Sequence, residues 1–210
     1  MSISVKTLVL GPLSANSYLI TDSQSGISAV IDPGEYNDAM KNEIKGKTIE
    51  YILLTHGHFD HLLGAADLKE ATGAKIAIHK DDEIGLKSEK ASLALWEYPD
   101  TQKFVSADIL LKDKDIINLG KTEIKVMHTK GHTRGGVCYI IEEDRIIFSG
   151  DTLFCLTAGR TDFDGGSEKE LMQSLKMLKN LEGDYTVYTG HNKSTTLDFE
   201  RTHNRFMRKL

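Results

Sequence analysis

The sequence predicts a four-layer αββα sandwich, an α/β fold in which two mixed β-sheets lie face to face with helices outside. Two observations lead to this prediction. In the first half, strand-like apolar runs alternate with amphipathic, helix-like stretches, as in layered α/β domains. From about residue 109, short strands separated by turns follow one another and indicate a second sheet, which helices again follow. The 210 residues contain no Pro- or Ser-rich linker and no internal repeat, so we expect one domain over 1–210.

The strands of the first half are recognised by apolar or alternating residues between turn-forming ones. They are predicted at residues 3–9, 17–21, 28–31, 49–54 and 74–79. One helix is predicted at 36–45, after the strand-ending Asp32-Pro33-Gly34. A second is predicted from Leu62 to Gly73, where apolar residues recur with helical spacing. Asp60, just before this helix, is a candidate N-cap.

The second half begins after a charged segment, residues 80–104, which Pro99 interrupts and which holds the only tryptophan, Trp96. We expect one or two short helices there and a loop that could border a site. Further strands are predicted at 116–119, 122–127, 137–141, 145–148 and 185–188. Helices are predicted at 167–181, with Ser167 as N-cap, and at 196–209.

The composition excludes several classes of protein. Hydrophobic residues make up 40% and charged residues 27% of the chain, as in soluble globular proteins. The net charge of −5 argues against a nucleic-acid partner, which favours a basic face. No apolar run reaches about 18 residues, so we expect no membrane span. The absence of a signal-peptide pattern, and two cysteines without a CxxC pair, favour a cytoplasmic location.

The most informative stretch is the loop after the strand at 49–54. It places His56, His58, Asp60 and His61 within six positions, without a Lys or Arg among them. A lone histidine at a strand end is usually a satisfied polar residue, but four ligand-type side chains in six positions are hard to explain as packing. Gly57, between the first two histidines, lets the backbone bend so that the imidazoles can converge.

Three later loops repeat the same order of apolar strand, glycine, and then histidine or aspartate. They contribute His132, Asp151 and His191, so that seven ligand-type residues are available. Seven exceed the needs of one catalytic zinc, which takes three protein ligands and a water. They suit two metals about 3.5–4 Å apart that share a carboxylate. The absence of cysteine from these loops argues against a closed structural zinc site.

These motifs resemble the metallo-β-lactamase superfamily, and within it the glyoxalase II-like hydrolases. The similarity covers nearly the whole chain. It includes Asn16-Ser17-Tyr18, Asp32-Pro33-Gly34, the HxHxDH loop at 56–61, Gly131-His132-Thr133, Gly150-Asp151-Thr152, Gly159-Arg160-Thr161-Asp162 and Thr189-Gly190-His191. The resemblance implies the metallo-β-lactamase fold and two divalent metal ions. Zinc is expected, although iron or manganese also suits histidine and carboxylate ligands.

The resemblance also implies roles for individual residues. The first metal would be held by His56, His58 and His132, and the second by Asp60, His61 and His191. Asp151 would bridge the metals and, with Asp60, form the pair of catalytic carboxylates. A hydroxide bridging the two metals would attack the carbonyl of a small-molecule thioester, of the hydroxyacylglutathione type, and the metals would stabilise the oxyanion.

Two further residues have alternative interpretations. In glyoxalase II-like proteins a basic residue at the place of Arg160 contacts a carboxylate of glutathione, a task that a guanidinium suits. Arg160 could instead pair structurally with Asp162 or Asp164. Asp32 could orient a ligand histidine or be a plain turn carboxylate. Among the remaining histidines, His79 is expected to face solvent.

Other functions of the same superfamily are alternatives to the thioester hydrolase. The serious alternative is a persulfide dioxygenase, which resembles the chain through the same HxHxDH loop and Gly-Arg-Thr-Asp turn but uses one iron and oxygen. A secreted β-lactamase would usually carry a cysteine where Asp151 stands, and a nuclease would need a basic groove. A non-catalytic metal-binding protein would be attractive only with a lost ligand. Full-length glyoxalase II adds a helical domain after the part resembled here, which leaves the thiol carrier and the acyl group open.

Overall fold

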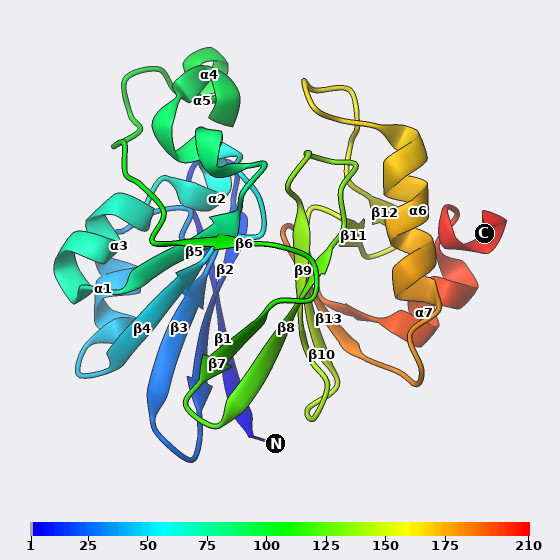
Figure 1. Cartoon of the computed structure of the whole chain (residues 1–210), viewed down its shortest axis with the longest axis horizontal. Helices are drawn as coiled ribbons and strands as arrows, with labels where there is room; N and C mark the ends of the chain where they lie inside the picture. The colour runs from blue at the N-terminus through cyan, green and yellow to red at the C-terminus, as the bar shows by residue number, and fades with distance from the viewer. Residues whose placement is uncertain (1) are drawn as a thin grey trace.

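The first of two β-sheets contains six strands that follow one another in chain order (Figure 1). The computed structural model describes residues 2–210. The strands are β1 (Ile3–Leu10), β2 (Ala15–Asp22), β3 (Ile27–Ile31), β4 (Thr48–Leu53), β5 (Lys75–His79) and β6 (Ile109–Leu111). Strands β1 to β3 are antiparallel, whereas β3 to β6 are parallel. The parallel part therefore brings the ends of β4 and β5 to the same edge of the sheet.

The second sheet also has six strands, in the order β14-β13-β10-β9-β8-β7. Its strands are β7 (Ile116–Leu119), β8 (Thr122–His128), β9 (Val137–Ile141), β10 (Ile146–Gly150), β13 (Thr186–Thr189) and β14 (Thr195–Thr196). The pairs are antiparallel except β10 with β13, which are parallel. A separate hairpin, β11 (Leu153–Phe154) with β12 (Thr157–Ala158), follows β10.

Helices cover the outer face of each sheet (Figure 1). The first sheet carries α1 (Asp38–Ile44), α2 (Phe59–Leu62) and α3 (Ala65–Thr72). The second carries α6 (Glu168–Lys179), α7 (Leu197–His203) and the 3-10 turn η2 (Met207–Lys209). A small cap over one end is formed by η1 (Glu83–Lys87), α4 (Glu89–Ser92) and α5 (Ala94–Glu97). Within residues 2–210, no helix has the length and apolar character needed to cross a membrane.

Three apolar clusters separate the layers. The cluster between the sheets joins Tyr18 and Leu53 of the first to Tyr139 and Phe148 of the second. A second cluster packs α1 and α3 on the first sheet, and a third packs α6 on the second through Leu171, Leu175 and Leu178. Ser167 caps α6 by accepting a hydrogen bond from the Glu170 amide, as its sequence position predicts. The predicted four-layer αββα sandwich is confirmed.

Individual elements differ from the sequence prediction for reasons of packing. The helix expected from Leu62 to Gly73 breaks into α2 and α3 at Gly64, whose amide donates to the Pro33 carbonyl at 2.8 Å. A Cβ at Gly64 would lie 2.6 Å from the Glu35 carbonyl carbon, so the two segments approach too closely for a side chain there. Asp60 is therefore inside α2, whose N-cap is His58.

Two more differences concern the second half of the chain. Residues 109–111 form β6 and complete the first sheet, with Leu111 buried between the sheets. The last helix ends at His203 instead of 209, because Asn204 leaves the helical conformation and donates its side-chain amide to the Thr157 carbonyl at 2.9 Å.

Candidate metal centre

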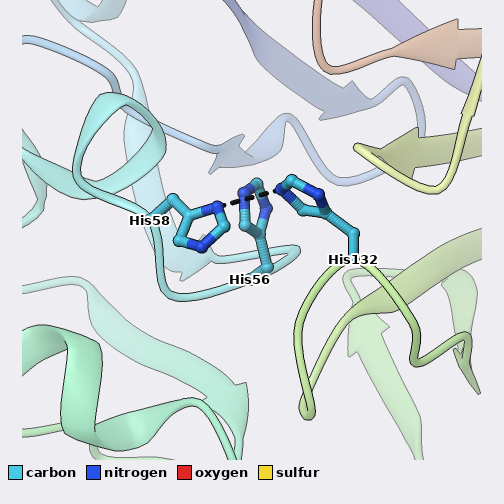
Figure 2. Close-up of side chains that lie close together, drawn as sticks. All are labelled: His56, His58 and His132. Atoms are coloured by element: carbon cyan, nitrogen blue, oxygen red, sulfur yellow. Dashed lines mark hydrogen bonds between the residues drawn. The ribbon is translucent and has the colours of Figure 1, made fainter. Parts of the chain in front are cut away.

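Three histidines from two loops meet at the edge where β4 and β8 end. His56 and His58 follow β4, and His132 follows β8. All three are buried, and one ring nitrogen of each lies within 4.8 Å of the others. Figure 2 shows the imidazoles gathered side by side, with a 2.9 Å contact between His58 Nδ1 and His132 Nε2. Between the first two, a Cβ at Gly57 would lie 2.8 Å from the Asp82 carbonyl oxygen, so the loop packs too closely for a side chain there.

A second group lies directly beside the first. It joins Asp60 and His61 of α2 to His191, which follows β13. The Nε2 atoms of His61 and His191 are 3.2 Å apart, and His191 Nε2 lies 3.1 Å from Asp60 Oδ2. Because α2 begins immediately after His58, its first turn places Asp60 and His61 beside His191.

Asp151 lies between the two groups. It follows β10, and its Oδ1 is 3.4 Å from His61 Nε2 while its Oδ2 is 3.5 Å from His132 Nε2. One carboxylate thus touches a histidine of each group. The structure therefore brings all seven residues predicted from the sequence to one place; their role as metal ligands remains a prediction.

Hydrogen bonds behind the rings determine which histidine nitrogen faces the centre. The Thr55 hydroxyl donates to Asp32 Oδ2 at 2.6 Å, so toward His56 Nδ1, 3.0 Å away, it can only accept. His56 Nδ1 is therefore the protonated nitrogen, and Nε2 presents a lone pair to the centre. Asp32 Oδ2 also accepts from His61 Nδ1 at 3.0 Å, which agrees with the expectation that Asp32 orients a histidine.

His132 is oriented in the same way by a backbone group. Its Nδ1 donates to the Arg160 carbonyl at 2.7 Å, because a carbonyl can only accept. His132 Nε2 is then an acceptor facing His58 Nδ1 and Asp151. At His56 and His132 these contacts turn a lone pair, and not an N–H, toward the space between the two groups.

The donor set fits divalent metal ions. His56 Nε2 and Asp151 Oδ1 are buried and have no hydrogen-bond partner among residues 2–210, although a buried polar atom without a partner is costly. Both residues belong to the cluster in which the nitrogen and oxygen donors of the two groups lie close together. A cation coordinated there would satisfy both atoms, as histidine and carboxylate metal sites do.

The electrostatics of the centre agree with this fit. Burial and the neighbouring imidazoles hold the pKa of His56 well below its usual value, and burial and His132 lower the pKa of His58 to about 3. These rings are therefore neutral, as ligands must be. At His61, burial opposes charging, but Asp60, Asp151 and Asp32 outweigh it and raise the pKa to about 10. The second group thus favours a positive charge at its centre.

Asp82 is a structural residue of this centre that the sequence interpretation missed. It is buried, and its carboxylate accepts hydrogen bonds from the Gly57 amide at 3.0 Å and the Gly135 amide at 2.6 Å. Gly57 lies in the loop of His56 and His58, and Gly135 in the loop of His132. A Cβ at Gly135 would lie 2.7 Å from the Asp82 side chain, so this close approach requires glycine. Asp82 therefore ties the two loops of the first group together.

A cleft of about 1090 Å³ opens over the centre. Arg160 lies in its wall, exposed, and donates two hydrogen bonds to Asp162 at 2.7 and 2.6 Å. Its guanidinium also lies 4.0 Å from the centre of the Phe163 ring. Arg160 thus stands at the predicted place and also makes the pair with Asp162 that was the alternative. Lys90 also lies exposed in the lining of this cleft.

His79 differs from its prediction. It was expected to face solvent but is 2% exposed, and its ring stacks on that of His128 with centroids 4.0 Å apart. The stacking joins the end of β5 in one sheet to the end of β8 in the other. Sequence alone cannot show this contact, because the two residues lie in different sheets and 49 positions apart.

The family of the chain follows from comparison with known proteins. A model of the metallo-beta-lactamase superfamily matches residues 10–191. The chain belongs to this superfamily, whose members are mostly hydrolytic metalloenzymes. Fold, family and side-chain cluster together imply a site for divalent metal ions.

Individual relatives narrow the comparison. The chain is 33% identical to an uncharacterized protein of Aquifex aeolicus over 98% of both chains. It is 35% identical to a hydroxyacylglutathione hydrolase of Pelagibacter ubique over 83% of its own length, and spans 65% of that protein. Two solved structures are similar over almost their full length. The BLEG-1 B3 metallo-beta-lactamase has a TM-score of 0.90 at 30% identity, covering 97% of this chain and 99% of that one. TTHA1623 in a di-iron-bound form has a TM-score of 0.85 at 32% identity, covering 96% and 100%.

Proposed function

We propose that this protein is a metal-dependent thioester hydrolase of the hydroxyacylglutathione type. The observation that carries the proposal is the placement of Asp151 between two groups of three ligand-type residues, beneath an open cleft. Such an arrangement suits two metals and a substrate carbonyl above them. The similarity to a hydroxyacylglutathione hydrolase supports the choice of a thioester, although the chain spans only 65% of that relative.

The residues of the chain would divide the work as follows. His56, His58 and His132 would hold one metal, and Asp60, His61 and His191 the other, with Asp151 shared. Bound metals of this kind supply an acidified water and polarise a carbonyl oxygen. Asp60 and Asp151 would accept hydrogen bonds from that water and so orient it toward the carbonyl. Asp32, Thr55 and the Arg160 carbonyl keep the imidazoles in their ligand tautomers.

Arg160 is proposed as a substrate contact at the rim of the cleft. Its pair with Asp162 is exposed, and screening by water and salt leaves an exposed pair of this kind with little stabilising effect. A substrate carboxylate could therefore replace Asp162 at little cost. The proposed role of Arg160 does not depend on which residues hold the metals.

A second candidate is hydrolysis of a β-lactam. It is favoured by the similarity to BLEG-1, a B3 metallo-beta-lactamase, over almost the whole of both chains. The two reactions share the attack of water on a carbonyl and differ in the bond that breaks. A β-lactam must therefore be included in any substrate panel.

The test is an anaerobic assay of the purified protein, run once with S-D-lactoylglutathione and once with a β-lactam. Release of free thiol without oxygen supports the thioester hydrolase. Cleavage of the β-lactam alone would replace it with the second candidate. A protein that is inactive on both, and that consumes oxygen with glutathione persulfide in a separate aerobic assay, would be a persulfide dioxygenase, and the hydrolase proposal would be wrong.

A further inference from the structure

The cleft over the metal centre has an apolar wall that the proposed reaction does not explain. Its lining includes Leu93 and Trp96 of the cap together with Leu13 and Phe154. Trp96 is 68% exposed and Leu13 47% exposed. Single exposed apolar residues are common, but several that face one cleft above a reactive centre indicate a surface used for binding.

Hydrogen bonds within the cap anchor the segment that carries Trp96. Ser92 is buried and hydrogen-bonded to Gln102, whose side-chain amide donates to the Gly85 carbonyl at 2.6 Å. Leu93 then adopts a left-handed conformation with φ of 71°, unusual for a residue with a Cβ, and ends α4 before α5 begins. The chain reverses at this residue, and α5 carries Trp96 to the cleft. The exposed indole thus belongs to an anchored segment.

Outside the metal centre, the net charge of the cleft lining does not favour an anionic ligand, so a substrate carboxylate would depend on its specific contact with Arg160. Apart from the residues of the metal centre, its lining contains two basic residues, Lys90 and Arg160, against three acidic ones, Glu97, Asp162 and Asp164. The guanidinium of Arg160 already carries Asp162 and lies over Phe163. With one more acidic than basic side chain in the wall, recognition by general charge attraction is weak, and apolar contact is the larger remaining source of affinity.

We propose that the substrate carries a bulky apolar group, which lies against Trp96 and Leu93 while its thioester carbonyl lies over the metal centre. This inference rests on the proposed thioester hydrolysis and specifies its substrate class. The apolar group could belong to the acyl part or to the thiol part of the thioester, because the wall offers the same surface to either. Both sources are separated by the experiment below.

Binding is measured first, without turnover. Trp96 is the only tryptophan, so intrinsic emission reports on the wall directly. The probes are S-hexyl and S-methyl thioethers of N-acetylcysteamine, which are neutral and cannot be hydrolysed. We expect the hexyl probe to shift the emission to shorter wavelength with saturation, and to bind roughly tenfold or more tightly than the methyl probe. An unchanged emission with both probes would overturn the inference.

Turnover is measured next with two series of neutral thioesters. One lengthens the acyl group from acetyl to hexanoyl on N-acetylcysteamine, and the other lengthens the thiol of an acetyl thioester. We expect kcat/KM to rise roughly tenfold or more along one series, which identifies the apolar part. Trp96→Ala should remove most of this rise. Because Trp96 is exposed, its replacement does not disturb the core.

A matched control lies in the same segment. Phe104 is 61% exposed but does not line the cleft, so Phe104→Ala should behave as the wild type in both series. If the protein hydrolyses the acetyl thioester but kcat/KM stays constant along both series, the apolar substrate is contradicted and thioester hydrolysis is not. A protein that hydrolyses no thioester in either series, nor S-D-lactoylglutathione, would contradict the proposed function itself.

Discussion

Asp32 Oδ2 lies 3.0 Å from His61 Nδ1 and also accepts the Thr55 hydroxyl, which in turn accepts from His56 Nδ1. One buried carboxylate at the end of β3 thus orients a histidine in each of the two groups of the centre. The Thr55 amide donates to its other oxygen at 2.7 Å, so the carboxylate is fixed on both sides. A residue outside the ligand set therefore couples the two halves of the centre.

Replacing Asp32 should weaken both halves of the centre. Asp32→Asn removes an acceptor that both histidine tautomers depend on, and changes of this kind typically cost 10- to 100-fold in metal affinity, an order-of-magnitude expectation. Competition with a chelator of known affinity measures the effect. Thr55→Val is the matched variant, because it breaks only the connection to His56 and should weaken the first group alone. If Asp32→Asn left the metal affinity of both ligand groups unchanged, the role given to this carboxylate would be contradicted.

Asp151→Ala should abolish turnover and lower the metal content. The substitution removes a carboxylate that lies 3.4 Å from His61 and 3.5 Å from His132 and so touches both groups. Activity and metal content are measured on the same preparation. Full activity with the alanine in place would be incompatible with a shared-carboxylate mechanism.

Asp82→Asn should loosen the first group without touching a ligand. An asparagine offers one acceptor oxygen where the Gly57 and Gly135 amides need two, and leaving one buried donor unpaired costs about 1–3 kcal/mol of unfolding free energy. We expect lower metal affinity and a lower kcat with little change in KM. The neighbouring Asp81 is exposed, so Asp81→Asn is a matched control that should change none of these. Equal effects of the two substitutions would mean that the Asp82 contacts do not position the loops.

Arg160→Ala should raise KM for an anionic thiol conjugate far more than for a small neutral thioester. The physical reason is that a guanidinium can bind a carboxylate with two hydrogen bonds but gains nothing from a neutral group. Arg134, which pairs with Asp164 at 3.3 Å and does not line the same cleft, provides the control Arg134→Ala. Similar increases of KM for both substrates would remove Arg160 from the binding site and leave its pair with Asp162 as its role.

The pH dependence of stability should show the contribution of Asp22. Its buried carboxylate joins the β2–β3 turn to the β7–β8 turn by accepting from the Ser25 and Lys121 amides and the Thr122 hydroxyl. Burial disfavours its charge, but these hydrogen bonds outweigh burial and hold the pKa well below its usual range. Since the unfolded chain has a pKa of about 3.9, the stabilisation is complete above that pH and is lost as pH falls toward the folded value.

We therefore expect Asp22→Asn to lower the free energy of unfolding at pH 7, by about 1–3 kcal/mol for the unpaired buried donors. The difference from the wild type should shrink between about pH 4 and pH 2, because the carboxylate of the unfolded chain becomes protonated there while that of the folded chain stays ionised. Urea denaturation at a series of pH values measures both. A difference that is constant from pH 7 to pH 2 would show that the charge of Asp22 contributes nothing.

The residues of the centre could be predicted from sequence because each follows a strand with a readable apolar pattern. His56, His132, Asp151 and His191 come after β4, β8, β10 and β13, and glycines beside them announce tight loops. Strands β8, β10 and β13 share the second sheet, so their local patterns also imply that the loops after them lie close together, whereas the approach of the β4 loop depends on the packing of the two sheets. The four-layer fold followed from the same patterns.

Other features depend on contacts that no local pattern contains. Asp82 sits among charged residues that are typical of a surface, and only the approach of Gly57 and Gly135 makes it a buried support. His79 is buried by a ring from the other sheet. Gly64 breaks a helix because Pro33 and Glu35 approach it from a distant part of the chain. In each case tertiary packing overrides a local preference that was correctly recognised.

The most direct test of the account is the metal content of the purified protein, measured together with anaerobic hydrolysis of S-D-lactoylglutathione. Two groups of three donors sharing Asp151 predict about two metal ions per chain and thiol release that needs no oxygen. Zinc or iron would both satisfy this prediction. One iron per chain, no hydrolysis, and oxygen uptake with glutathione persulfide would contradict it.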